Sequence, residues 1–300
     1  MDGLTLKQLR YFEPVARHGH FGRAAEASSV SQPAISVQIR ELEESLGQVL
    51  FERGARQVRL TAFGETFAPR VRHILRAIDD LSDLARTSAE RLVGKLRLGV
   101  IPTIGPYLLP QVLRGLARDF PEADLSIRET QTDTLIRDVQ NGRLDAALLA
   151  LPISEPGLVE TRLFDEDFVL VRETSDADRP VPTGQSLSQM RLLLLEEGHC
   201  FRDQALDFCG PVSARNNDNM EASSLATLVQ MVASGMGVTL LPEMAVDLET
   251  VGAKVNVARF PTPRPTRTIG LIWRANSPLT SQRGAVAKCI EASVRQQGSR

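Results

Sequence analysis

Two cysteines in this 300-residue chain have neighbours that could make a thiol reactive. Cys200 follows the apolar run 192–195, directly after His199 and two residues before Arg202. A nearby positive charge, or the N-terminus of the helix expected over residues 202–208, favours thiolate over thiol. A thiolate can attack the O–O bond of a peroxide and become a sulfenic acid, which a second cysteine converts to a disulfide. Cys209 is the candidate for that second cysteine.

The spacing of these two cysteines adds a geometric requirement. If residues 200–209 formed one helix, nine steps of about 1.5 Å would separate the two Cα atoms by roughly 13 Å. A disulfide needs a Cα separation of about 4.4–6.8 Å, so closing it would unfold at least part of the helix. The alternative is that both cysteines are small buried apolar residues, as free cysteines often are.

The third cysteine, Cys289, lies in the helical run 284–295 without a neighbouring His or Arg, so it is expected to be a core residue. The N-terminus lacks the pattern of a secretory signal, and no stretch of 18 apolar residues occurs. These features predict a cytoplasmic protein with no membrane partner. Thiols are kept reduced in that compartment, so a disulfide there would be transient. No metal site or cofactor is predicted.

The net charge of −2 does not by itself indicate a nucleic-acid partner. Residues 1–92 carry 13 Lys and Arg against 12 Asp and Glu, so the N-terminal part is barely basic. Any argument for DNA binding therefore rests on where the charges lie and on the order of the elements.

The first 60 residues have the element order of a winged helix-turn-helix. Apolar residues at helical spacing predict one helix before Gly19 and a short helix over residues 21–28. Ser31 suits the beginning of a third helix and Gly47 its end. Two short strands are expected over residues 51–60, forming a wing that carries Arg53, Arg56 and Arg59.

The third helix would present its outer face to DNA. Its apolar stripe is Ile35, Ile39, Leu42 and Leu46, and the residues outside this stripe include Gln32, Pro33, Ser36 and Arg40. The N-terminal end of such a helix contacts base edges in the major groove, where Gln can pair with adenine and Ser with several bases. The wing arginines suit phosphate or the minor groove. The alternative is that any three-helix protein shows polar residues opposite its apolar stripe.

A long helix is expected from its N-cap, Thr61, to about residue 92. Its apolar residues recur at spacings of 4 and 3, the period of a coiled coil: Phe67, Val71, Ile74, Ile78, Leu81 and Ala85. This period favours packing against a partner helix over packing on the helix's own domain.

From residue 93 onward, predicted strands and helices alternate. Strands are expected at 95–101, 124–129, 145–151, 167–171, 192–196, 238–241 and 268–273, and helices at 107–119, 133–141 and 222–234. The alternation predicts an α/β fold of parallel sheets covered by helices. About 200 residues is large for one such sheet, so two lobes are expected. Lobe I would hold residues 93–165 and 268–300, and lobe II residues 166–267.

Four motifs in the N-terminal part resemble the LysR-type transcriptional regulators. They are FGRAAEA at 21–27, VSQPAIS at 30–36, IRELEESLG at 39–47, and LFER at 50–53 with LTAFG at 60–64. They agree with that family in order and spacing over residues 4–67. The resemblance implies a winged helix-turn-helix, a long dimerising linker helix and a two-lobed regulatory domain like a periplasmic binding protein.

The segment LEEGHCFRDQALDFC at 195–209 is similar to the redox loop of the hydrogen-peroxide sensors in this family, and further motifs extend that likeness over nearly the whole chain. The resemblance implies that Cys200 is the peroxidatic cysteine and Cys209 the resolving one. It also implies that peroxide or the thiolate is surrounded by Thr103, Thr132, His199, Asp203 and Arg267. The alternatives are that both threonines are only helix N-caps, and that Arg267 is an exposed charge at a strand end.

The partners that the resemblance implies are double-stranded promoter DNA, hydrogen peroxide, RNA polymerase and a thiol reductant such as glutaredoxin or thioredoxin. It also implies a homodimer that assembles into a homotetramer. Two positions depart from the better-known sensors, which carry His where this chain has Arg128 and Asn219. The peroxide sensitivity is therefore left open.

Two rival functions stay open at this point. One is a LysR-type regulator that binds a small metabolite between its lobes, with incidental cysteines. The other is a thiol peroxidase, which would leave the helix-turn-helix and the coiled-coil period without a purpose. A non-enzymatic regulator is the first choice.

Overall fold

The computed structural model describes residues 3–53, 58–86, 94–209 and 220–295. The chain separates into two compact units, Met1–Ala85 and Arg86–Arg300. One hydrophobic core fills the first unit, and two cores fill the second. No helix in the described ranges is both long and apolar enough to cross a membrane.

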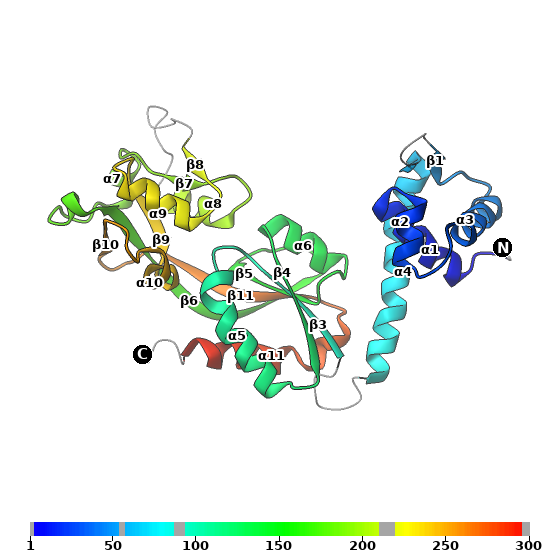
Figure 1. The fold of residues 1–300 in the computed structure, drawn as a ribbon. Helices are drawn as coiled ribbons and strands as arrows, with labels where there is room; N and C mark the ends of the chain where they lie inside the picture. Colours follow the sequence, from blue (N-terminus) through cyan, green and yellow to red (C-terminus); the bar gives the residue numbers. More distant parts are fainter. Residues whose placement is uncertain (1–2, 54–57, 87–93, 210–219, 296–300) are drawn as a thin grey trace. The chain divides into compact units, whose positions relative to one another are not determined.

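The N-terminal unit has the predicted helices and wing strands (Figure 1). They are α1 (Leu6–His18), α2 (Phe21–Ala27), α3 (Gln32–Leu46), β1 (Phe51–Arg53) and β2 (Val58–Leu60). Thr5 begins α1 by accepting a hydrogen bond from the backbone N–H of Gln8. Gly19 and Gly47 end α1 and α3 at φ values of 61° and 62°, in the left-handed region that glycine tolerates. Ser31 occupies the N-cap position of α3 without a side-chain cap bond.

The apolar stripe of α3 is the centre of this unit's core. Ile35, Ile39 and Leu42 are fully buried, and Phe12 packs with its ring centroid 5.2 Å from that of Phe51. Because this stripe is buried, the opposite face of α3 points toward solvent.

The long helix α4 (Ala62–Arg86) begins where Thr61 Oγ1 accepts a hydrogen bond from Gly64 N–H at 3.0 Å. Near its start, Val71 is buried in the core of the N-terminal unit. Further along, Ile74 and Leu81 are 43% and 65% exposed. Large exposed apolar side chains on a 3.5-residue period support a partner helix, which stays a prediction.

The second unit is built on a seven-stranded sheet in the order β10-β6-β11-β5-β3-β4, with β9 also paired to β6. Its strands are β3 (Gly94–Val100), β4 (Ala123–Glu129), β5 (Ala146–Leu151), β6 (Leu158–Glu173), β9 (Thr239–Pro242), β10 (Val255–Arg259) and β11 (Thr266–Arg274). The strands β7 (Leu194–Leu195) and β8 (Glu221–Ala222) form a separate parallel pair.

Helices connect and cover these strands. They are α5 (Gly105–Asp119), α6 (Thr132–Gln140), α7 (Gly184–Leu187), α8 (Cys200–Cys209), α9 (Leu225–Ala233), α10 (Val246–Glu249) and α11 (Arg283–Arg295). Short 3-10 turns are η1 (Thr174–Asp176), η3 (Glu243–Ala245) and η4 (Pro278–Ser281).

The prediction of parallel sheets is correct for only part of this unit. Strand β3 is parallel to both β4 and β5. The pairs β11–β5, β11–β6, β10–β6 and β6–β9 are antiparallel. The reason is that β6 is a single 16-residue strand that carries the chain from the first core to the second, and β11 returns beside it (Figure 1). The fold is nevertheless the expected α/β, two-lobed one.

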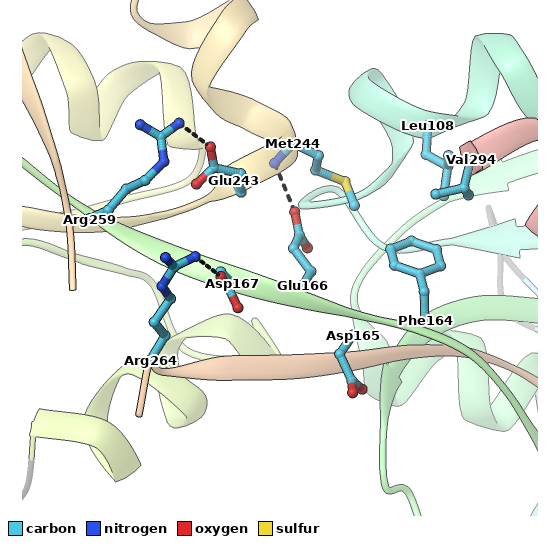
Figure 2. A pocket seen from close by; sticks show the side chains of 10 residues that line it. All are labelled: Leu108, Phe164, Asp165, Glu166, Asp167, Glu243, Met244, Arg259, Arg264 and Val294. Carbon is cyan, nitrogen blue, oxygen red and sulfur yellow. Dashed lines mark hydrogen bonds and ion pairs between the residues drawn. The ribbon is translucent and has the colours of Figure 1, made fainter. Parts of the chain in front are cut away.

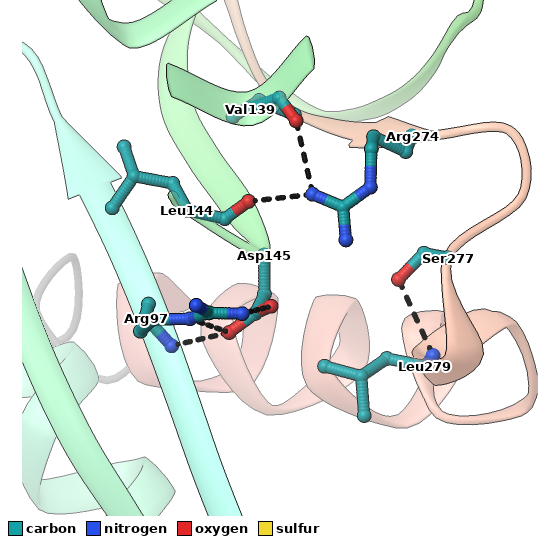
Figure 3. Close-up of polar contacts among 7 residues, drawn as sticks. All are labelled: Arg97, Val139, Leu144, Asp145, Arg274, Ser277 and Leu279. Carbon is teal, nitrogen blue, oxygen red and sulfur yellow. Dashed lines mark hydrogen bonds and ion pairs between the residues drawn. The ribbon is translucent and has the colours of Figure 1, made fainter. Parts of the chain in front are cut away.

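Charged side chains bind one another and the backbone beside the first core, where β5 begins (Figure 3). Arg97 Nη2 lies 2.8 Å from Asp145 Oδ1, and Arg97 Nε donates to Asp145 Oδ2 at 3.1 Å. Arg274 Nη1 donates to the carbonyls of Val139 and Leu144, each at 3.0 Å. The Arg274 bonds satisfy one carbonyl in the last turn of α6 and one in the loop before β5, and the Arg97 bonds tie β3 to the residue before β5.

Candidate functional site

Two threonines meet at one edge of the sheet because their strands are parallel neighbours. Val100 at the end of β3 is paired with Glu129 at the end of β4, and Thr103 and Thr132 each follow three residues later. Both threonines are buried, with exposed fractions of 2% and 8%. Ligand sites form at such carboxyl ends of parallel strands.

Arg267 is a buried cation that holds Thr103. Its Nη1 donates to Thr103 Oγ1 at 2.9 Å, and its Nε donates to Glu166 Oε2 at 2.7 Å. The alternative of an exposed strand-end charge is wrong, because Arg267 is only 3% exposed. Thr103 is not the N-cap of α5, since Ile104 occupies that position. Glu166 was not expected as a site residue.

Thr132 has a hydroxyl without a protein partner among the described residues. It is the first residue of α6, and Gln131 occupies the N-cap position, so the N-cap alternative is wrong for Thr132 too. Its Oγ1 is buried and makes no hydrogen bond. A buried hydroxyl costs free energy when it is unbonded, so this atom is suited to bind a small polar ligand.

The cysteine loop lies against the N-terminus of α6. Gln131 Nε2 donates to the carbonyl of Glu197 at 3.4 Å. Gly198 has φ of +91°, a backbone conformation that favours glycine, and Gln131 Oε1 lies 2.8 Å from where a Cβ would be. The contact brings the residues preceding α8 close to the residue before Thr132.

Cys200 is the first residue of α8, as the sequence predicts for a residue near the helix start. Its side chain is partly buried and packs against the first core. The next residue, Phe201, is buried in the second core, 5.1 Å from the ring centroid of Phe168. The guanidinium of Arg267 lies 5.7 Å from the centroid of the Phe201 ring. The start of α8 therefore touches both cores and the buried cation.

The positive charge of the site comes from Arg267 and not from His199. His199 is buried, and this burial lowers the pKa of its imidazole, although Glu196 acts in the opposite direction. Its imidazole is therefore neutral at pH 7. Arg202 is bonded to the carbonyl of Leu195 and to Glu221, at 2.8 and 2.7 Å. Asp203 has an exposed side chain, so it differs from the other predicted residues of this site.

Cys209 ends α8 and is buried in the second core. Burial raises the pKa of its thiol to about 11, so it is protonated at neutral pH. Because α8 is continuous from Cys200 to Cys209, the two Cα atoms are about 13 Å apart. Cys289 is buried in the first core, and burial together with Asp119 raises the pKa of its thiol to about 12.

One of the two positions where the better-known sensors carry His, Arg128, lies in the described part of the structure. Arg128 Nη1 lies 2.7 Å from Asp138 Oδ2, and Arg143 Nη1 lies 3.2 Å from the other oxygen of this carboxylate. Arg128 is thus bound to α6. Asn219 lies outside the described residues.

Of the residues predicted to contact DNA, α3 exposes Gln32, Pro33 and Arg40 and leaves Ser36 half-buried. Arg53 is the last residue of β1, but its side chain and all of Arg56 lie outside what the structure describes.

A hollow of about 580 Å³ lies where β6 passes between the cores (Figure 2). Its charged side chains are bonded to one another or to their neighbours. Arg264 Nη1 donates to Asp167 at 2.9 Å, Arg259 pairs with Glu243 at 2.5 Å, and Glu166 accepts from Met244 N–H at 2.9 Å. Elsewhere in the described ranges, no group of three or more His, Cys, Asp or Glu could hold a metal ion.

Known proteins match the chain over nearly its whole length. Residues 89–295 match the LysR substrate binding domain, and residues 6–65 match the bacterial regulatory helix-turn-helix protein of the lysR family. A probable hydrogen peroxide-inducible genes activator from Streptomyces viridosporus is 44% identical over 97% of this chain and 95% of that protein. The DNA-binding transcriptional dual regulator OxyR of Escherichia coli K12 is 40% identical over 97% of this chain and 96% of that protein.

Solved structures of full-length relatives agree with this assignment. A cysteine-to-aspartate variant of OxyR from Pseudomonas aeruginosa superposes with a TM-score of 0.77 at 37% identity, covering 98% of this chain and 96% of that one. A hydrogen peroxide-bound cysteine-to-serine variant of OxyR from Corynebacterium glutamicum gives 0.68 at 34% identity, covering 97% and 93%. The two family models and the relatives that match nearly the whole chain show that it belongs to the LysR family of bacterial DNA-binding transcription regulators, and that OxyR proteins are among its similar relatives.

Proposed function

We propose that this regulator responds to hydrogen peroxide through Cys200 and Cys209. The Cys200 thiolate attacks one peroxide oxygen, the O–O bond breaks, and the sulfur becomes a sulfenic acid while the other oxygen leaves as hydroxide and takes up a proton to become water. The Cys209 sulfur then attacks the sulfenic sulfur, forming the disulfide and releasing a second water. Two thiols are oxidised and one peroxide is reduced.

The observation that carries this proposal is the buried, unbonded hydroxyl of Thr132 at the sheet edge that also holds Thr103. A peroxide can accept a hydrogen bond from such a hydroxyl and another from a donor beside it. Arg267 supplies fixed positive charge next to the helix that begins at Cys200. The Streptomyces viridosporus relative is named a probable hydrogen peroxide-inducible genes activator, and the Corynebacterium glutamicum structure holds hydrogen peroxide, which supports the same ligand for this chain.

The disulfide would act as a conformational switch because α8 cannot remain intact. The two cysteines at its ends must approach from about 13 Å to about 6 Å. Phe201 and Cys209 are both buried in the second core, so this movement would also break core contacts. We infer that the rearranged core changes how paired regulatory domains pack and how the DNA-binding domains meet promoter DNA.

The proposed organisation has residues 1–60 as the DNA-binding domain, 61–92 as the linker and dimerisation helix and 93–300 as the regulatory domain. Exposed Ile74 and Leu81 on α4 support a homodimer, from which a homotetramer would assemble. RNA polymerase and a thiol reductant of the glutaredoxin or thioredoxin kind are the further proposed partners. Without a reductant, each chain would reduce one equivalent of peroxide, because one disulfide forms per chain.

The test is a peroxide titration of the reduced full-length protein, quenched by thiol alkylation and read by mass spectrometry. We expect one disulfide between Cys200 and Cys209 per chain and a changed DNA footprint, both lost in Cys200→Ser. If Cys200→Ser changes its footprint with peroxide as wild type does, the thiol switch is wrong and a metabolite-responsive regulator takes its place. Rapid multiple turnover with a reductant would instead favour a thiol peroxidase.

A further inference from the structure

The exposed face of α3 carries a branched apolar side chain, that of Val37. Val37 lies in α3 and leaves 48% of its surface exposed. At 3.6 residues per turn, it lies about 160° around the helix from both Ile35 and Ile39, which are buried. Its isopropyl group is therefore at the middle of the outer face.

The charges along this outer face show which part of α3 can approach DNA. Glu41 and Glu44 are exposed in the C-terminal half, where phosphate groups would repel their carboxylates. Pro33 and Arg40 are exposed one turn before and one turn after Val37. The N-terminal half is thus the part that fits a major groove, and Val37 lies on the exposed face of this half.

We propose that Val37 determines sequence specificity by contacting the C5 methyl group of a thymine. In the major groove, thymine is the base that presents a methyl group. The valine side chain has no hydrogen-bonding group, so it distinguishes bases only by apolar contact and by steric fit. The contact selects an A·T or T·A pair at one position in each half-site. This inference rests on DNA binding by α3 and does not depend on the cysteines.

The test uses reduced full-length protein and the duplexes that it selects from a randomised pool. Each thymine of a selected duplex is replaced in turn by deoxyuridine, which keeps the hydrogen-bonding edge and lacks only the methyl group. In each half-site, we expect one thymine whose replacement weakens wild-type binding about fourfold. This factor corresponds to the free energy of removing one methyl group from water. Val37→Ala should bind the thymine and deoxyuridine duplexes with equal affinity.

Val49→Ala is the matched control, because Val49 is also exposed, at 60%, but lies between α3 and β1. This variant should keep the wild-type sensitivity to deoxyuridine. Thermal unfolding of both variants checks that the fold is intact. If no thymine distinguishes wild type from Val37→Ala, Val37 is an ordinary exposed apolar residue and the proposal is overturned. Failure of the peroxide response would leave the result unchanged, because every measurement is made on reduced protein.

Discussion

Arg267 and Thr103 are 164 residues apart in the chain, yet the Nη1 of the arginine donates to the threonine hydroxyl at 2.9 Å. The Nη2 of Arg267 also donates to the carbonyl of Thr103 at 3.0 Å. On its other side, the guanidinium is bonded to Glu166, which accepts a further bond from Met244 N–H at 2.9 Å. One buried cation on β11 therefore joins the segment after β3 to β6, and through Glu166 to η3. Phe201, the second residue of α8, packs over this cation and against Phe168 of β6.

Replacing Arg267 with Met should lower the free energy of unfolding by about 3–5 kcal/mol, because the carboxylate of Glu166 would stay buried without its cation. Adding Glu166→Gln to this variant should recover part of the loss, since the uncompensated charge is then removed. Urea unfolding of the two single variants and the double variant measures the coupling. Strictly additive losses would show that the pair is not coupled.

Thr132→Val and Thr103→Val should behave differently although both remove one hydroxyl. Thr132 Oγ1 has no described bond, so valine should leave the stability unchanged or raise it by about 1 kcal/mol. Thr103 Oγ1 accepts from Arg267, so its valine variant should lose about 1–3 kcal/mol.

The rate at which peroxide oxidises Cys200 tests whether the Thr132 hydroxyl binds peroxide. If the Thr132 hydroxyl binds peroxide, Thr132→Val should slow oxidation of Cys200 roughly tenfold, the effect of losing one hydrogen bond of about 1.4 kcal/mol. Rapid quenching with an alkylating agent, followed by mass spectrometry, measures that rate. Oxidation at the wild-type rate would exclude Thr132 from the peroxide site.

Local sequence patterns predicted the elements that carry the site. The helix that begins at Cys200 was expected from an apolar run followed by a turn, and β3 and β4 were recognisable from their apolar residues. The position of Thr103 and Thr132 at the same end of the sheet follows from the parallel pairing of β3 and β4, which the structure shows. The family resemblance, and not the pattern, selected these two hydroxyls among the polar residues nearby.

Local sequence patterns could not predict the contacts between residues far apart in the chain. Glu166 is one of several acids in β6, and only the return of β11 beside this strand brings Arg267 to it. The antiparallel pairing of β6 and β11 was missed because a 16-residue strand shared by two lobes has no local signature. His199 was expected to be a nearby positive charge, but its burial, which tertiary packing decides, makes the neutral imidazole the stable form.

His199 should make the stability of the protein depend on pH below neutrality. Burial lowers its folded-state pKa, so between this value and the ordinary value of about 6.5 the unfolded chain binds more protons than the folded one. The free energy of unfolding therefore falls as the pH is lowered through this range. Urea unfolding at pH 7.5 and pH 5.5 should show a larger loss for wild type than for His199→Gln, which cannot be protonated. Equal losses would show that the pKa of His199 is the same in the folded and the unfolded chain.

The three cysteines should differ in their reaction with iodoacetamide at pH 8 in the reduced, folded protein. Cys200 is partly exposed at the start of α8, whereas Cys209 and Cys289 are buried. Burial also raises the pKa values of these two thiols to about 11 and about 12, which leaves little of the reactive thiolate at pH 8. Mass spectrometry should therefore find the label on Cys200 first, and in urea on all three at similar rates. If folded Cys209 is labelled as fast as Cys200, α8 opens without oxidation, and the disulfide would need no unfolding step to close.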